Sequence, residues 1–203
     1  MRDLDRGFKH HVELTIAAAR AVAKLGLSGQ VSMHIATMPP YNLDLLDSLS
    51  EIDNLHVMFN LEVWEPKAFD QICPGKTRDY GRDKMLIALN RLREVLGPYR
   101  AHSLLVTGLE PPHAVTAGAR ALCEMGISPI INVYHSDRHS RLGLGSRPSF
   151  DQLSEVARSL QGLYAKYPIR PYWRNCGRNA IDAEAARGLF STEAPQFLTR
   201  SNC

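Results

Sequence analysis

Strand-like and helix-like segments alternate along this chain, and the alternation limits the folds that it can adopt. Short apolar runs predict four strands, at residues 30–38, 56–64, 101–109 and 128–135. Apolar residues at helical spacing predict five helices, at residues 8–25, 42–50, 85–97, 114–126 and 150–167. Because each strand is followed by a helix, we expect an α/β fold with a parallel sheet and right-handed crossovers.

Two parts of the chain fall outside this alternation. Residues 65–83 contain Pro66, Pro74, Gly75 and Gly81, so we expect a loop with at most one helical turn. The tail from residue 168 has no strong periodicity and is expected to be irregular, with a short helix at 181–189. This divides the chain into an ordered part, 1–167, and a C-terminal tail, 168–203.

The number of predicted strands indicates an incomplete barrel. Four strands are too few to close the usual eight-stranded parallel barrel. The first predicted element is a helix, although in such folds a helix normally follows a strand. We therefore expect that the chain begins part-way through a partial, TIM-like barrel; the alternative is an open four-stranded sheet.

Composition excludes several classes of function. Hydrophobic residues make up 44% of the 203 residues and charged residues 22%, which is typical of one folded domain. A net charge of +3 and 7% aromatic residues do not favour nucleic-acid binding. No apolar run approaches the roughly 20 residues that span a bilayer, and residues 1–11 do not resemble a secretory signal. We expect a cytoplasmic protein.

The four cysteines do not form a metal or redox motif. Cys73, Cys123, Cys176 and Cys203 lie far apart, and no pair has C-x-x-C spacing. In a reducing compartment they are expected to be free thiols. The sequence predicts no metal ligands; the alternative for Cys176 is a position facing a substrate or another cofactor.

Asn60 and Glu62 are the most unusual residues within a predicted strand. They stand two residues apart and therefore on one face of a strand that is otherwise apolar. Burying two polar groups costs free energy unless they have partners, and parallel strands are usually covered on both faces. We predict that the pair binds a ligand; the alternative is that it faces solvent on an edge strand.

Other candidates lie where the third and fourth predicted strands end, since reactive groups in parallel α/β folds gather at carboxyl ends of strands. The third strand ends in Thr107, Gly108 and Glu110, and the fourth in Asn132 and Tyr134. The glycine permits close approach of a ligand, or simply makes a tight turn.

The loop after the fourth strand is basic. Arg138 and Arg141 suit a carboxylate or a phosphate, although a solvated basic loop is the commoner explanation. His34, inside the first strand, is interpreted as an ordinary core or edge residue.

The middle of the chain, residues 60–111, resembles radical S-adenosylmethionine (radical SAM) proteins of the biotin-synthase-like group. Three runs carry the resemblance: NLEV at 60–63, ICPGK at 72–76 and VTGLE at 106–110. The resemblance implies a partial barrel of six strand–helix units, of which this chain would supply the last four. It also implies S-adenosylmethionine and a [4Fe–4S] cluster as cofactors, and hydrogen abstraction from a substrate by a 5′-deoxyadenosyl radical.

The resemblance also implies roles for the candidate residues. Asn60 and Glu62 would contact the ribose or the amino-acid part of S-adenosylmethionine. Thr107, Gly108 and Glu110 would lie near adenine, and Asn132 and Tyr134 near the nucleoside. Substrate contacts are expected from four basic residues: Lys76, Arg82, Arg138 and Arg141.

The chain departs from the family at its beginning. The C-x-x-x-C-x-x-C motif that holds the cluster is absent from the sequence, and one thiolate such as Cys73 cannot hold a cluster alone. We therefore expect a fragment that is inactive by itself and needs a missing N-terminal segment or a partner chain.

Two other hypotheses for the function of the chain stay open. The chain could be a non-catalytic partial-barrel module that binds a nucleoside or a partner. It could also be an unrelated lyase in which Lys76 forms a Schiff base, although no neighbour in the sequence is placed to lower the pKa of this amine.

Overall fold

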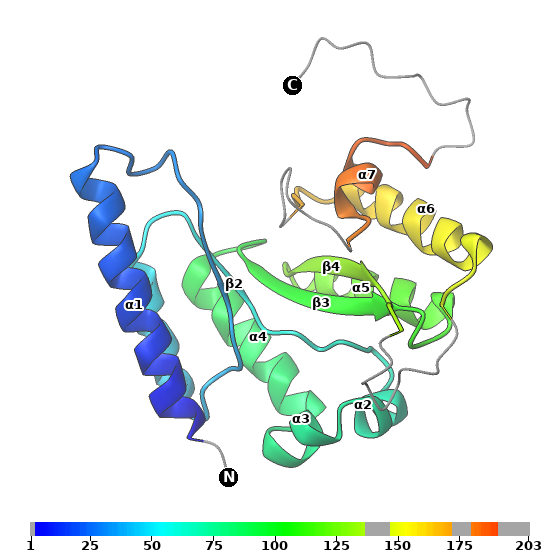
Figure 1. The fold of residues 1–203 in the computed structure, drawn as a ribbon, viewed down its shortest axis with the longest axis horizontal. Coiled ribbons are helices and arrows are strands. Elements are labelled where there is room, and N and C mark those ends of the chain that lie inside the picture. The colour runs from blue at the N-terminus through cyan, green and yellow to red at the C-terminus, as the bar shows by residue number, and fades with distance from the viewer. Residues whose placement is uncertain (1–2, 137–146, 172–179, 191–203) are drawn as a thin grey trace.

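The computed structural model describes residues 3–136, 147–171 and 180–190 (Figure 1). Four strands form one parallel sheet: β1 (Met33–Ala36), β2 (Leu55–Met58), β3 (Ala101–Thr107) and β4 (Ser128–Val133). The helices are α1 (Leu4–Lys24), the 3₁₀ helix η1 (Leu43–Glu51), α2 (Pro66–Ile72), α3 (Pro74–Asp79), α4 (Arg82–Leu96), α5 (Pro112–Glu124), α6 (Phe150–Lys166) and α7 (Asp182–Ala186). The alternation expected from the sequence is confirmed.

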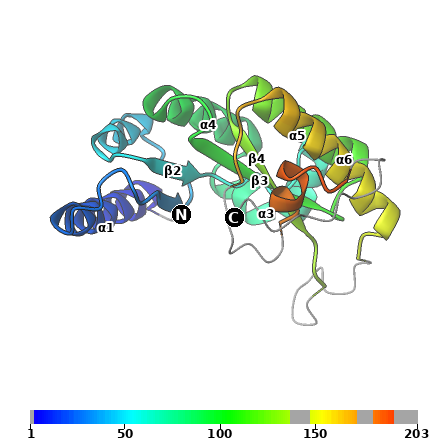
Figure 2. The same cartoon turned by 90° about the horizontal axis from the view of Figure 1, so that it is seen from above.

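The strands lie side by side in chain order, and each pairs in parallel with the next. Figure 2 shows α1, α4, α5 and α6 following one another in an arc on the outer side of the sheet. α1 packs on β1, α4 on β2 and β3, and α5 on β3 and β4. This is the arrangement of a TIM-like barrel that covers only part of the circle.

The sheet buries apolar side chains on both faces, as parallel sheets do. On the outer face, the main core includes Val57 and Leu105, packed with helix residues such as Leu89. On the inner face, Met58, Leu104 and Ile130 form a second, smaller cluster. Leu104 and Leu105 belong to different clusters because successive side chains of a strand point to opposite faces.

The segment at 65–83 differs from the loop expected from the sequence. It contains two short helices, α2 and α3, and begins a third, α4. Pro66 and Pro74 are each the first residue of a helix, where the missing N–H is harmless and the fixed φ suits the helix. These prolines therefore start helices rather than break them, and the second of these helices carries Lys76.

The second strand is shorter than the sequence predicted. Regular pairing ends at Met58 and does not extend to Trp64. Glu62 has a φ of +72°, which lies outside the strand region of conformational space. Asn60 and Glu62 therefore lie beyond the regular strand, and not within it as expected. Burial still alternates along this segment: Phe59, Leu61 and Val63 are buried, while Asn60 and Glu62 are partly exposed.

Part of the C-terminal tail lies along the outer edge of β4. Ala180 forms an antiparallel bridge with Asn132, and Ile181 N donates to Ile131 O at 3.1 Å. Asp182 Oδ1 accepts from Ile131 N at 3.1 Å. Backbone groups at the edge of a sheet need partners, and residues 180–182 supply some of them here.

Burial raises the pKa of Asp182 to about 7, and the hydrogen bond from Ile131 N opposes this only in part. The folded chain then binds this proton more tightly than the unfolded chain, whose aspartates titrate near 3.9. Stability from this group is therefore greatest at low pH and falls as pH rises from about 4 to about 7.

Asp182→Asn keeps an acceptor for Ile131 N and removes the buried charge. We expect the difference in unfolding free energy, variant minus wild type, to be about 2–3 kcal/mol larger at pH 8 than at pH 5. Urea unfolding at both pH values measures this difference, and Asp83→Asn, at a side chain that is 92% exposed, is the control. A difference for Asp182→Asn that does not grow with pH would contradict the interpretation.

None of the helices in the described ranges combines the length and the apolar character that crossing a lipid bilayer requires.

Candidate functional site

The chain that follows β2 stays alongside β3 and forms the centre of the candidate site. Phe59 N donates to His102 O at 3.1 Å, and Glu62 N donates to Leu104 O at 2.8 Å. Val106 N donates in turn to Glu62 O at 2.7 Å. These bonds hold Glu62 at its positive φ, a conformation that few non-glycine residues adopt and that often marks a functional position.

Lys76 reaches this segment from α3. Its Nζ donates to Asn60 O at 2.8 Å and to Glu62 Oε1 at 2.6 Å. The side chains of Lys76 and Glu62 are only 22% and 27% exposed, so water screens their ion pair in part. An ammonium that is paired in this way orients the carboxylate, and the pairing does not favour Lys76 as an amine nucleophile.

Asn60 carries a polar atom that needs a partner. Its Oδ1 is buried, and within the described ranges no donor lies in hydrogen-bonding reach of it. Buried acceptors are almost always satisfied in folded proteins, so an exception calls for an explanation. A ligand that donates a hydrogen bond to Asn60 Oδ1 would supply one.

Cys73 lies close enough to the ion pair to respond to its charges. Burial raises the pKa of the Cys73 thiol, Lys76 lowers it to a smaller extent, and Glu62 and Glu110 raise it. The net direction is upward, so the thiol stays protonated at neutral pH. This is the opposite of the lowered pKa that reactive or metal-binding cysteines show.

Glu110 holds the backbone next to the site. Its Oε2 accepts from Trp64 N at 2.5 Å and its Oε1 from Glu65 N at 2.6 Å. Burial raises the pKa of the Glu110 carboxyl, while the two backbone donors lower it to a smaller extent. Both oxygens therefore fix the start of α2, where the first N–H groups have no partner within the helix.

Arg82 packs against the indole of Trp64. Its guanidinium carbon lies 4.7 Å from the centre of the indole ring, and its Nε donates to Trp64 O at 2.7 Å. Gly118 of α5 faces the same indole, because a Cβ added there would lie 2.7 Å from Trp64 Cγ. Trp64 is thus held by Glu110, Arg82 and the close approach of α5.

The remaining candidates lie where β3 and β4 end. Thr107 is buried, and its carbonyl accepts from Tyr134 N at 3.0 Å. Gly108 has a φ of +101°, and a Cβ there would lie 2.8 Å from Pro148 Cδ. Glycine is therefore required at this turn by conformation and by space. Asn132 lies at the edge of β4, where it bridges to Ala180.

The structure thus brings some of the predicted site residues into contact. Asn60, Glu62 and Lys76 form one group, Glu110 and Arg82 meet through Trp64, and Thr107 meets Tyr134. Arg138 and Arg141 lie outside the described residues, as do Cys176 and Cys203.

Trp64 and Gly118 were missed by the sequence analysis. A glycine in the middle of a helical pattern is a signal of close packing, and it was the only clue to this contact.

The described residues do not fit an iron–sulfur cluster. Cys73 is half-buried and Cys123 is buried in α5. Burial raises the pKa of Cys123 to about 12, whereas cluster ligands are thiolates. Over residues 3–136, 147–171 and 180–190, no three His, Cys, Asp or Glu side chains are placed to hold a metal ion.

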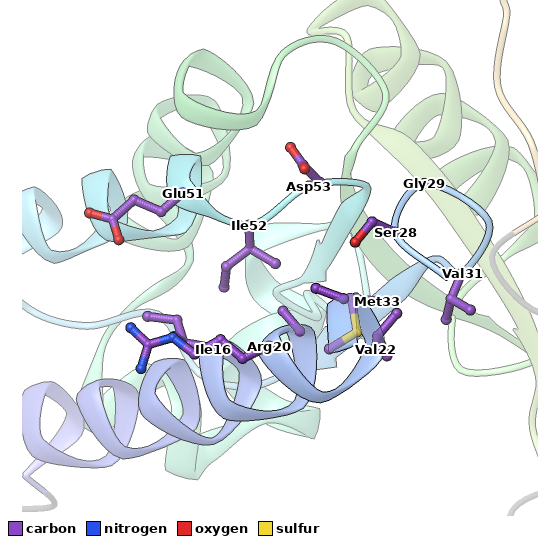
Figure 3. Close-up of a pocket in the computed structure, with 12 residues that line it drawn as sticks. Ile16, Arg20, Val22, Ser28, Gly29, Val31, Met33, Glu51, Ile52 and Asp53 are labelled. Atoms are coloured by element: carbon purple, nitrogen blue, oxygen red, sulfur yellow. The ribbon is translucent and has the colours of Figure 1, made fainter. Parts of the chain in front are cut away.

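A cavity of about 300 Å³ lies apart from these residues (Figure 3). It opens between α1 and the segments that precede β1 and β2, and its lining includes Ile16, Val22, Met33 and Ile52. Arg20, Ser28, Glu51 and Asp53 also line it, and no histidine, cysteine or lysine occurs among the described residues of its lining. The cavity shares no lining residue with the group formed by Asn60, Glu62 and Lys76.

The chain is similar to known proteins both in sequence and in structure. No family model matches the chain. Over 160 residues the chain is 27% identical to bacteriochlorophyllide c C-7(1)-hydroxylase of Chlorobaculum limnaeum, an alignment that covers 78% of this chain and 40% of that protein. The chain therefore spans well under half the length of this curated relative.

The second similarity is structural. The fold resembles the crystal structure of a radical SAM methyltransferase from Sphaerobacter thermophilus, with a TM-score of 0.52 and 16% sequence identity. The match covers 75% of this chain and 42% of that one. At this identity the likeness concerns the fold, and it agrees with the partial barrel expected from the sequence.

Proposed function

We propose that this chain is part of a radical SAM enzyme and that it binds S-adenosylmethionine at the carboxyl edge of its sheet. The fold shared with a radical SAM methyltransferase supports this, as does the weaker sequence similarity to a hydroxylase. We also propose that residues 60–111 place the chain in the biotin-synthase-like group of radical SAM proteins. When bound, S-adenosylmethionine would supply a 5′-deoxyadenosyl group for hydrogen abstraction from a substrate.

The observation that carries the proposal is the buried acceptor of Asn60. Its Oδ1 has no donor in the described residues, and it belongs to the same short segment as Glu62. In the proposal, Asn60 Oδ1 accepts from the amino or hydroxyl groups of the cofactor. Glu62 accepts from a second group, and Lys76 holds the Glu62 carboxylate in place.

The other candidates have supporting roles in the proposal. Thr107, Gly108 and Tyr134 form the turn near adenine, and Asn132 lies further along the same edge. Glu110 and Arg82 position Trp64 rather than touch the cofactor. In the proposal, Arg138 and Arg141 contact the substrate.

The cluster ligands must come from outside these 203 residues, because the sequence lacks their motif. A preceding segment or a partner chain would supply them. The chain alone is therefore expected to bind the cofactor without cleaving it.

A module that binds a nucleoside and performs no chemistry is the second candidate, and the missing cysteine motif favours it. Sequencing the native DNA around this reading frame separates the two. An in-frame or adjacent stretch that encodes C-x-x-x-C-x-x-C supports the enzyme, and a frame with no such stretch nearby supports the module.

Asn60→Ala separates binding from stability. Removing a buried acceptor that has no donor should leave the free energy of unfolding unchanged or slightly higher. Loss of its hydrogen bond to the cofactor should weaken S-adenosylmethionine binding about tenfold, which corresponds to roughly 1.4 kcal/mol. Calorimetric titration of the full chain measures the affinity, and urea unfolding measures the stability.

The matched control is Asn90→Ala, at an asparagine of α4 whose Nδ2 donates to Glu94 Oε1. This variant should bind S-adenosylmethionine like the wild type. If the wild type does not bind, or if Asn60→Ala binds as tightly as the wild type, the assignment of this site is wrong.

A further inference from the structure

Three histidines form a cluster at the amino ends of three neighbouring strands. His34 of β1 and His56 of β2 are register partners, and their rings stack at 5.0 Å with an interplanar angle of 9°. The ring of His102 of β3 lies 5.1 Å from that of His56, and His56 Nδ1 is 2.9 Å from His102 Nε2. We call these three residues the histidine cluster.

The histidine cluster lines a cavity of about 900 Å³. The other walls come from the segment that precedes β1, from Asn54 before β2, from residues 98–100 before β3, and from residues 168–171 after α6. Asn54 holds the first of these walls, since its Nδ2 donates to Val31 O and Ser32 Oγ. The cavity therefore opens at the amino edge of the sheet, opposite to Asn60 and Glu62.

The charged side chains among the described residues of this lining are all basic. The titratable and charged side chains that line the cavity are His34, His56, His102, Tyr99, Arg100 and Arg170. No Asp or Glu occurs among the described residues that line it. Guanidinium and imidazole groups donate hydrogen bonds to oxyanions, and the planar guanidinium of arginine can donate two parallel N–H bonds to two oxygens of a phosphate or a carboxylate.

The protonation state of the cluster should respond to an anion. Burial lowers the pKa of His102 well below its ordinary value, and the neighbouring imidazoles of His56 and His34 lower it further. A bound anion opposes both effects, because it stabilises an imidazolium in the cluster. Anion binding should then be coupled to proton uptake and should be tighter at lower pH.

We propose that this cavity is a binding site for an oxyanion group, the phosphate or carboxylate of a small molecule, held by the histidine cluster together with Arg100 and Arg170. The proposal does not depend on the cofactor site, because it rests on residues at the opposite edge of the sheet. A metal ion fits less well, since His56 Nδ1 and His102 Nε2 face each other at hydrogen-bond distance.

The first test is a titration of the full chain with sodium sulfate at constant ionic strength, followed by the side-chain ¹⁵N resonances of histidine. Sulfate keeps its charge between pH 6 and pH 8. We expect saturable shifts at His56 and His102, no shift at the exposed His113, and tighter binding at pH 6 than at pH 8. Parallel titrations with inorganic phosphate and acetate show whether the site prefers a phosphate or a carboxylate.

Two variants make the test specific. Arg170→Gln changes an exposed side chain, so it should fold normally, and it should weaken sulfate binding about tenfold. His56→Gln should weaken it at least as much, and His113→Gln should have no effect. Shifts that do not saturate, sulfate binding unchanged in Arg170→Gln, or saturable shifts with Zn²⁺ but not with any of the three anions would overturn the proposal.

Discussion

Replacing Glu110 by alanine is expected to lower the free energy of unfolding by about 2–4 kcal/mol. The carboxylate is 7% exposed and accepts from Trp64 N and Glu65 N. Alanine leaves both N–H groups without this acceptor at the start of α2, and each unsatisfied group costs about 1–3 kcal/mol where water cannot replace the partner. Urea unfolding of the variant and the wild type measures the loss.

Two variants separate this role from a general effect of charge. Glu110→Gln keeps one acceptor oxygen and should fall between the wild type and the alanine variant. Glu65→Ala removes the neighbouring, exposed carboxylate, which makes no capping bond, and should change stability by less than about 0.5 kcal/mol. Equal effects of Glu110→Ala and Glu65→Ala would contradict the contact.

Gly118→Ala is expected to destabilise the chain by about 1–3 kcal/mol, although alanine is the better helix former. The added Cβ would lie 2.7 Å from Trp64 Cγ and 2.8 Å from Trp64 Cβ. Because Trp64 Cβ is fixed to the backbone, rotation of the indole cannot relieve this contact, and either α5 or the segment that carries Trp64 must shift. Thermal and urea unfolding measure the stability, and tryptophan fluorescence reports the displacement of the indole.

Gly162→Ala is the matched control in α6, since no atom lies within 4 Å of a Cβ at that position. This variant should stabilise the chain by about 0.5–1 kcal/mol, the usual gain for a helix interior. The two alanine substitutions should thus have opposite signs. If Gly118→Ala also stabilises the chain, the close approach of α5 to Trp64 is wrong.

The sequence predicted the elements whose signals are local. The helices at 85–97 and 150–167 appear as α4 and α6, because their apolar periodicity and their ends are set by nearby residues. The helix expected at 42–50 begins at its asparagine, because the side chain of Asn42 caps η1 by accepting from Asp44 N at 3.0 Å. Such signals depend on neighbours within a few residues, so a single sequence contains them.

The prolines of residues 65–83 predict a loop, and this prediction is wrong. Pro66 and Pro74 each begin a helix. The residue type alone does not distinguish a loop from a helix start, because the fixed φ of proline suits both a turn and the first position of a helix. The consequence matters for the site, since α3 is the element that brings Lys76 to Glu62.

The contacts of the site could be predicted only in part. The polar character of Asn60 and Glu62 marked the segment, but their geometry depends on bonds to β3 more than 40 positions away in the sequence, such as Leu61 N to Ser103 Oγ. The contact of Glu110 with the backbone at 64–65 is equally distant. A sequence shows which groups are polar, and the fold decides which of them meet.

The histidine cluster could not be predicted from the sequence for the same reason. The sequence indicates that His34 is an ordinary core or edge residue, whereas the register of β1 and β2 pairs it with His56 so that the two rings stack. Register is set by the pairing of whole strands, and no local pattern around His34 contains it.

The central claim is that S-adenosylmethionine binds at Asn60, and the most direct test is to locate it by NMR. In a ¹⁵N-labelled chain, the side-chain amide of Asn60, identified by its loss in Asn60→Ala, should shift on titration together with the backbone amides of residues 60–62. Amides near the histidine cluster should not move. Shifts confined to the amino edge of the sheet, or none at residues 60–62, would contradict the account.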